Sequence, residues 1–430
     1  MIDRPTFARR LALAALAASL TGSASAAPGG LTLDAERLPD FQPGSADKVE
    51  MTEQDWDNWR RKHENAFKRA VRSGNVAGAS GNELRRGAKF YADALTYPGV
   101  VNKLPDLVDE ILTQTDTFAD GEVKELLLEE FANNLLPMLY HDKAIVRLNA
   151  VRALARLNYN PGAAVGGRAP APYWPVYRAL LSVVEDPKRT PAEKVLAVDG
   201  LQRIAEDSDI DRRDLDAIIK RGSAALEALT DPANVPQGGP DKDFWWVPYR
   251  LATLMGSVNS PLTLNRQPLP VEALVKIAAD EQQHWVVRAA SVRAISELRL
   301  EDEGRFDVAA MARLATGVAS KMAVAYNANP KDSRWRQAFW DLYFAFKPRT
   351  KEQFDAGSGF LAKVQDGAFR KHSAAVNEAF EPVKALMAAI APMDPVAMKP
   401  LPQEVTSALA DFAAANPPTA VHPSIAAVTP

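Results

Sequence analysis

The sequence predicts an all-α fold in which helical hairpins stack on one another as an α-solenoid of about five or six repeats. Three observations support this prediction: helix-start signals are frequent, strand signals are scarce, and one helical pattern recurs along the chain. Apolar and polar residues do not alternate over any sustained stretch, and no Asn-Gly or Asp-Gly turn joins two β-branched runs, as a strand hairpin would require.

The first 26 residues have the pattern of a cleavable secretory signal peptide. Basic residues in MIDRPTFARR precede the apolar run LALAALAASL, and Ala24 and Ala26 supply small residues before the cleavage site. The apolar run of about ten residues is too short to span a bilayer. Arg9 and Arg10 invite a twin-arginine interpretation, but their neighbours match that signal weakly, which favours the general secretory route. We therefore expect a periplasmic or secreted protein, with no stable membrane insertion after cleavage.

Composition divides the rest of the chain into four parts. Residues 27–51 are polar and predict an extended arm, and residues 52–118 predict a helical cap. Residues 119–391 carry the repeats of the solenoid. Residues 392–430 form a Pro-rich tail with one short helix, and we expect the last fifteen residues to be disordered.

Helix-start signals mark the predicted helices in order along the chain. Thr52 begins Thr-Glu-Gln-Asp, a capping box that leads into an apolar stripe. Thr190 begins Thr-Pro-Ala-Glu, which places an N-cap, a proline at the first helical position and a glutamate at the third. Thr350 begins Thr-Lys-Glu-Gln and repeats the pattern. Each of these sites predicts a helix that starts at the next residue.

One helical pattern recurs five times. Residues 146–157 read VRLNAVRALARL and residues 287–298 read VRAASVRAISEL, with the same apolar stripe and two Val-Arg pairs in register. Weaker copies begin at residues 193, 243 and 334, so that successive starts are 47, 50, 44 and 47 residues apart. A period of this length, with two helices in each unit, is typical of helical solenoids, because no hairpin can bury its apolar face alone.

The residues from Leu136 to Leu157 resemble a HEAT repeat and are most similar to the bilin-lyase-like subgroup of that family. A second copy runs from Leu274 to Arg288, with a longer turn before its Val-Arg pair. The resemblance is clear over residues 120–300 and weaker as far as about 390. It implies a ladder of hydrogen bonds between stacked repeats, made by a turn aspartate and the arginine after it. In this sequence those residues are Asp142, Arg147, Asp280 and Arg288.

The composition excludes several classes of chemistry. The chain has no Cys, which rules out disulfides, iron–sulfur clusters, c-type haem and a cysteine nucleophile. A net charge of −3 argues against a nucleic-acid binder, which needs a basic surface. None of the five His lies at metal-ligand spacing from another, and the acidic turn from Asp207 to Asp211 lacks the Gly and Glu of a calcium loop. We therefore expect no cofactor, no metal and no enzymatic activity.

One row of residues is the best candidate for a binding surface. The seventh position of each repeat lies beside the apolar stripe of the second helix, and the resemblance implies that second helices line the concave surface of the solenoid. A row that mixes arginine with aromatic side chains has the composition of a protein-binding hot spot. The row consists of Arg152, Asp199, Tyr249, Arg293 and Trp340.

The sequence thus favours a non-catalytic scaffold or adaptor of the bacterial cell envelope that binds a protein partner. A first alternative is an envelope polysaccharide-binding module that uses the clustered tryptophans, namely Trp245, Trp246, Trp335 and Trp340. Aromatic residues at helical spacing also pack into cores, and the sequence leaves that interpretation of the tryptophans open. A second alternative is an enzyme subunit or a lyase-like activity, which only the name of the similar subgroup suggests.

Overall fold

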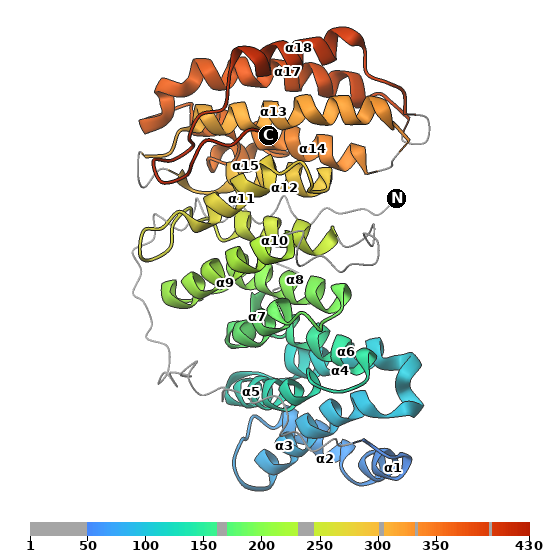
Figure 1. Cartoon of the computed structure of the whole chain (residues 1–430). Coiled ribbons are helices and arrows are strands. Elements are labelled where there is room, and N and C mark those ends of the chain that lie inside the picture. Colours follow the sequence, from blue (N-terminus) through green and yellow to red (C-terminus); the bar gives the residue numbers. More distant parts are fainter. Residues whose placement is uncertain (1–49, 161–169, 231–244, 301–304, 332–333, 395–397) are drawn as a thin grey trace. The chain divides into compact units, whose positions relative to one another are not determined.

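The computed structural model is all-α, as the sequence predicts (Figure 1). It describes residues 50–160, 170–230, 245–300, 305–331, 334–394 and 398–430. The predicted signal peptide and all but the last two residues of the predicted arm lie outside these ranges. The described chain separates into two compact units, an N-terminal unit of residues up to Ile210 and a C-terminal unit that begins at Asp211.

The N-terminal unit contains eight α-helices among its described residues, together with short 3₁₀ and π turns. The helices are α1 (Glu53–Lys62), α2 (Glu64–Arg72), α3 (Gly78–Asp93), α4 (Leu104–Thr113), α5 (Gly121–Met138), α6 (Ala144–Leu154), α7 (Tyr177–Glu185) and α8 (Pro191–Asp207). The short turns are η3 (Ala94–Thr96), η4 (Pro98–Lys103), η5 (Gln114–Phe118) and η6 (Trp174–Val176). Two short strands, β1 (Asn158–Asn160) and β2 (Ala171–Pro172), pair antiparallel between α6 and α7.

The C-terminal unit contains ten α-helices among its described residues. They are α9 (Arg212–Thr230), α10 (Trp246–Ser257), α11 (Leu269–Ala279), α12 (Trp285–Glu297), α13 (Val308–Ala328), α14 (Trp335–Phe346), α15 (Lys351–Asp355), α16 (Phe360–Lys363), α17 (Ser373–Ile390) and α18 (Gln403–Ala415). A 3₁₀ turn, η8 (Gly367–His372), precedes α17.

Within each unit the helices pack as successive hairpins. In the N-terminal unit α5 packs on α3 and α6, α6 lies between α4 and α8, and α7 packs on α8. In the C-terminal unit α9 pairs with α10 and α11 with α12. The second helices α10, α12 and α14 lie side by side in one layer, while α11 contacts α9 and α13 in the other. This two-layer arrangement buries the apolar stripe that recurs in the sequence.

Polar contacts between neighbouring hairpins recur at the sequence period. They join residues 46 to 49 positions apart, which is one repeat along the chain. The pairs are Arg147–Glu193, Arg156–Asp109, Arg293–Asp341, Arg203–Ala155 and Lys276–Glu227. Equivalent positions of successive hairpins therefore face one another inside each unit, as the sequence period requires.

The helix starts predicted from the sequence are confirmed at two capping boxes. The Thr52 side chain accepts from the Asp55 N–H, and the Asp55 carboxylate accepts from the Thr52 N–H. Thr190 and Glu193 make the same reciprocal pair at the start of α8. Thr350 accepts from the Gln353 N–H at 3.2 Å and begins the short helix α15. Each cap satisfies main-chain donors that the first turn of a helix leaves without a partner.

The C-terminal segment differs from the sequence prediction of disorder over the last fifteen residues. Val421, His422 and Ile425 are buried, and the Asp307 N–H donates to the Val421 carbonyl at 2.9 Å. A pocket lined by α13, α18 and residues 418–430 lies where the segment runs over α13. Gly317 of α13 permits the close approach, because a Cβ there would lie 2.5 Å from Pro430 Cγ. Proline-rich composition indicated disorder, but it does not reveal an apolar surface elsewhere in the fold that the segment covers.

Among the described residues, α13 is the one helix long and apolar enough to span a membrane by length and composition alone. Of its most apolar window, 72% is buried inside the protein. It contacts α14, α17 and α18. Packing within the C-terminal unit therefore accounts for its apolar character.

Candidate functional site

Three residues of the predicted binding row lie on one layer of the C-terminal unit. Tyr249 is on α10, Arg293 on α12 and Trp340 on α14, and α12 packs directly against both other helices. All three side chains are half-buried. We call the surface formed by these residues with Tyr343 and Phe344 the second-helix cluster.

Arg293 is held in place by two carboxylates. Its Nε donates to Glu297 Oε1 at 2.9 Å, and its Nη1 donates to Asp341 Oδ1 at 3.0 Å. Burial alone would lower the pKa of Arg293, but the two carboxylates raise it above its ordinary value. The guanidinium therefore stays charged and fixed in orientation, while a quarter of the side chain remains exposed.

Asp341 and Gln337 of α14 hold Arg293 in place through a chain of hydrogen bonds. Asp341 is fully buried and accepts from Gln337 Nε2 at 2.8 Å. Burial raises the pKa of Asp341, and the hydrogen bonds from Arg293 and Gln337 oppose that shift. Burial, with a smaller contribution from the Asp341 charge, also raises the pKa of Tyr249. The Tyr249 hydroxyl therefore stays protonated at the cluster and available as a hydrogen-bond donor.

Aromatic rings complete the second-helix cluster. The Trp340 ring stacks on Phe344 with ring centroids 5.2 Å apart. The Arg293 guanidinium lies 5.8 Å from the centre of the Phe344 ring, and that of Arg349 lies 4.7 Å from it. Tyr343 meets both Trp340 and Phe344 edge-on at 6.0 Å. The cluster thus combines the fixed cation of Arg293 with half-exposed aromatic faces.

The supporting residues of this cluster were not identified from the sequence. Glu297 lies four residues after Arg293, the spacing at which side chains meet on a helix, and that signal was available. Asp341 lies 48 residues after Arg293, one repeat further on. Its role depends on which face α14 turns towards α12, and the weak copy of the repeat at residue 334 did not fix that register.

The tryptophans proposed for a polysaccharide surface divide between core and surface. Trp335 is only 6% exposed, whereas Trp246 is 43% exposed. The Trp245 ring stacks on Trp246 at 4.0 Å and on His284 at 5.3 Å. Trp245 and Trp340 are half-buried. The core interpretation is therefore correct for Trp335, while Trp246 presents its ring to solvent.

The two remaining row residues belong to the N-terminal unit. Arg152 lies on α6 and Asp199 on α8, helices that pack against each other, and both side chains are half-buried. Arg152 makes no ion pair with any residue that the structure describes. The structure thus gathers the row into two groups, one in each unit.

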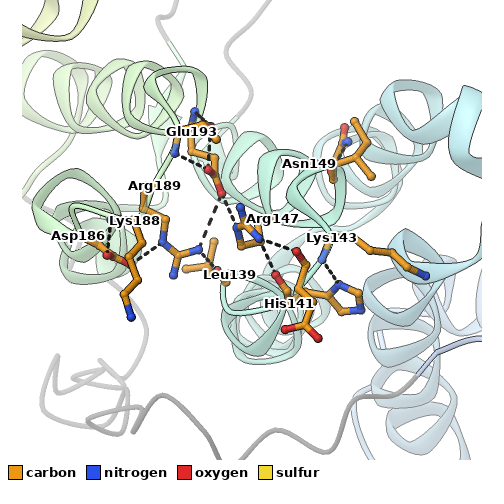
Figure 2. Close-up of polar contacts among 12 residues, drawn as sticks. Leu139, His141, Lys143, Arg147, Asn149, Asp186, Lys188, Arg189 and Glu193 are labelled. Atoms are coloured by element: carbon orange, nitrogen blue, oxygen red, sulfur yellow. Dashed lines mark hydrogen bonds and ion pairs between the residues drawn. The ribbon is translucent and has the colours of Figure 1, made fainter. Parts of the chain in front are cut away.

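Arg147, the first predicted ladder arginine, joins two hairpins of the N-terminal unit (Figure 2). Its Nη1 donates to the carbonyls of His141 and Asp142, both at 2.9 Å, within its own hairpin. Its Nε donates to Glu193 Oε1 at 2.7 Å on the next hairpin. The contact between hairpins therefore ends on Glu193, and Asp142 takes part through its main-chain carbonyl.

Glu193 is the centre of this network. It is fully buried, it accepts from Arg147 and from Thr190, and Arg189 Nη1 lies 3.8 Å away. Burial would raise the pKa of Glu193, but the hydrogen bonds from Arg147 and Thr190 outweigh it and lower the pKa below the ordinary value of 4.5. Arg189 also donates to the Leu139 carbonyl of the preceding hairpin. Figure 2 shows Arg147 and Arg189 converging on the Glu193 carboxylate.

The second predicted ladder pair has a different geometry. Asp280 accepts from the Gln282 N–H and from Gln283 Nε2, both at 2.9 Å, and so caps its own turn. Arg288 is fully buried beside the Trp285 ring and donates through Nε to the Ala278 carbonyl at 2.9 Å. Burial lowers the pKa of Arg288 to about 10. The longer turn in this copy leaves Asp280 engaged locally.

Lys194, at the position equivalent to Arg288, makes the same contact in another hairpin. Its Nζ donates to the Val184 carbonyl at 2.7 Å, ten residues earlier, just as Arg288 reaches back ten residues to Ala278. In both hairpins a basic side chain on the second helix satisfies a carbonyl at the end of the first helix.

Over the ranges that the structure describes, no group of three or more His, Asp or Glu side chains is arranged to hold a metal ion. The chain matches no known family model and no curated protein. Its function is therefore inferred from an all-α fold of packed helical hairpins and from the residues described above.

Proposed function

We propose that this chain is a non-catalytic scaffold of the bacterial cell envelope that binds a protein partner through the layer of second helices. The observation that carries the proposal is the second-helix cluster. Arg293 is fixed by Glu297 and Asp341 and lies next to the half-exposed rings of Phe344 and Trp340. Arginine and aromatic side chains that are already ordered bind partners at low entropic cost, and they dominate hot spots.

We infer that the hairpins are HEAT-like repeats and that the protein is exported. The two-layer packing of the C-terminal unit and the contacts that recur 46 to 49 residues apart support the first inference. The signal-peptide pattern of residues 1–26 supports the second. Mass spectrometry of the mature N-terminus in a fractionated bacterium tests export, and a chain that still begins at Met1 in the cytoplasm would exclude it.

The binding proposal is tested by affinity capture from envelope extracts with the tagged chain. We expect the wild-type chain to capture one protein at constant stoichiometry, and Trp340→Ala to weaken this interaction by about tenfold or more. Trp340 is half-buried on the layer surface, so circular dichroism must first establish that the variant keeps its helical content.

Phe118→Ala is the matched control, because Phe118 is 40% exposed in the N-terminal unit and lies outside the second-helix cluster. We expect this variant to retain the partner. Equal loss in both variants, or no loss in either, would contradict a partner site at the second-helix cluster.

Exposed Trp246 supports a second candidate, a polysaccharide-binding surface. Its ring is stacked on Trp245 and 43% exposed, and such a face suits the apolar side of a sugar ring. Titration of the chain with soluble envelope polysaccharide should then quench tryptophan fluorescence, and Trp246→Ala should abolish that quenching. Binding of polysaccharide without any protein partner would replace the scaffold proposal by this one.

A further inference from the structure

A second candidate site lies in the N-terminal unit and shares no residue with the second-helix cluster. It is an open pocket of about 440 Å³ lined by α1, α2, α3, η4 and α4. This volume lies within the range of small-molecule sites. Aromatic and acidic side chains dominate the lining; those that carry the argument are Trp56, Tyr97, Phe90, Tyr91, Glu53 and Glu110.

The aromatic wall is ordered by ring stacking. The Trp56 ring stacks on Tyr97 at 5.5 Å and lies 5.4 Å from Phe90. Phe90 in turn stacks on Trp59 at 4.4 Å, and Trp59 is buried. Trp56 and Tyr97 remain half-exposed at the pocket surface. Their faces attract a cation without first having to become ordered.

Three carboxylates of the lining, those of Glu53, Asp106 and Glu110, are not paired with a cation among the described residues. Glu110 accepts from the Tyr91 hydroxyl at 2.8 Å, and burial together with the Glu110 charge raises the pKa of Tyr91, so the phenol remains a donor. Glu110, Asp106 and Glu53 form no ion pair with any residue in the described ranges. Such carboxylates beside aromatic faces favour a positively charged ligand.

The basic residues near the pocket do not cancel this charge. Five carboxylates line it, those of Glu53, Asp57, Glu64, Asp106 and Glu110, against the two cations of Arg60 and Lys103. Arg60 and Lys68 both pair with Glu64, at 3.6 and 2.5 Å, and Arg61 pairs with Asp57 at 3.2 Å. The carboxylates of Glu53, Asp106 and Glu110 therefore remain in excess over the one remaining cation, Lys103. An adjoining pocket shares Asp106 and Glu110 but is also lined by Lys68 and Arg72. A cation is therefore favoured in the first pocket.

We propose that this pocket binds a small aliphatic amine, with its ammonium group against the exposed surface of the Trp56–Tyr97 stack and close to the carboxylates of Glu110 and Glu53. The carboxylates attract the charge of such a ligand. The aromatic rings add cation–π attraction for the ammonium group and apolar surface for the methylene chain. The site goes beyond the proposed scaffold function and shares no residue with the second-helix cluster.

Isothermal titration calorimetry of the intact chain with spermidine tests the proposal. We expect saturable binding with one site, weakened by high salt because the contact is partly ionic. Absence of saturable binding would overturn the proposal. So would tighter binding of a neutral oligosaccharide, or of a lysine-containing peptide, than of spermidine, because each would assign the pocket to another ligand class.

Two variants test whether spermidine binds in this pocket. Glu110→Gln removes the charge while keeping the shape, and Trp56→Leu keeps apolar packing on Phe90 while removing the indole face. We expect each to weaken spermidine binding by about tenfold. Glu122→Gln is the matched control, since Glu122 is exposed on α5 and outside the pocket, and it should bind as the wild type does. Equal binding by all three variants would overturn the site, whatever the outcome for the scaffold proposal.

Discussion

The Glu193 side chain has two structural roles: it caps a helix and it joins two hairpins. It caps the start of α8 through Thr190, and it accepts from Arg147 of the preceding hairpin at 2.7 Å. Both contacts are stronger with the ionised carboxylate than with the neutral acid, and the residue is fully buried. Loss of the charge therefore weakens a helix cap and a contact between hairpins at once, and it leaves the Arg147 guanidinium largely buried without its anion.

We predict that Glu193→Gln lowers the free energy of unfolding of the N-terminal unit by about 3 kcal/mol at pH 7. Because the folded pKa of Glu193 is lowered, its contribution is present above its ordinary pKa of 4.5 and is lost as pH falls through the folded pKa. The Tm difference between wild type and variant should therefore shrink below pH 4.5. A difference that stays constant down to pH 3 would contradict this role, and Glu122→Gln serves as the exposed control.

The sequence identified Arg147 and Glu193 separately, but not the contact between them. The repeat pattern identified Arg147 as a residue that joins hairpins, and the capping box identified Glu193 as a helix-start residue. Their pairing was not predicted, because it depends on how closely one hairpin approaches the next. The same reason applies to Asp341, whose burial beneath Arg293 is a property of the layer and not of the local sequence.

At the scale of elements, the segment after α18 behaves as part of the C-terminal core. Val421 and Ile425 are buried, and the His422 ring packs on Phe306 with centroids 4.8 Å apart. The His422 Nδ1 accepts from the Ser424 N–H at 3.2 Å and forms part of the turn. Burial and the nearby Arg305 charge lower the pKa of His422, which favours its neutral form. The segment thus covers apolar surface of α13 that would otherwise face water.

We predict that Val421→Asp releases this segment and lowers the free energy of unfolding of the C-terminal unit by about 2 kcal/mol, the value of one buried aliphatic side chain. The matched control is Ala420→Asp, which places the same charge one residue earlier at an exposed position. Limited proteolysis should cut residues 416–430 sooner in the first variant than in the second. Equal cleavage of both would show that burial of Val421 does not hold the segment.

At the scale of the whole molecule, the chain is two compact units, each made of hairpins that contact their sequence neighbours. The all-α class and the period of the hairpins were predictable, because helix caps and apolar stripes are local signals. The division at residues 210 and 211 was not, since the short connection between α8 and α9 carries no break in composition. Stability in such a fold is a sum over neighbouring hairpins.

We therefore predict that core damage stays within one unit. Phe131 of α5 and Phe339 of α14 are both fully buried, and replacing either by Ala costs about 3–5 kcal/mol. Hydrogen exchange followed by mass spectrometry should show faster exchange in residues 50–210 for Phe131→Ala and in residues 211–430 for Phe339→Ala. Faster exchange throughout both units in either variant would show that the chain unfolds as a single cooperative body.

The contacts of Lys194 and Arg288 with the ends of α7 and α11 have an evolutionary consequence. Each basic side chain joins the two helices of its own hairpin by donating to a carbonyl ten residues earlier, and this contact involves no residue of a neighbouring hairpin. Because this contact lies within one hairpin, it is kept when the gene segment that encodes a neighbouring hairpin is copied or lost. A change of chain length by one repeat would thus leave the internal contact of each remaining hairpin in place.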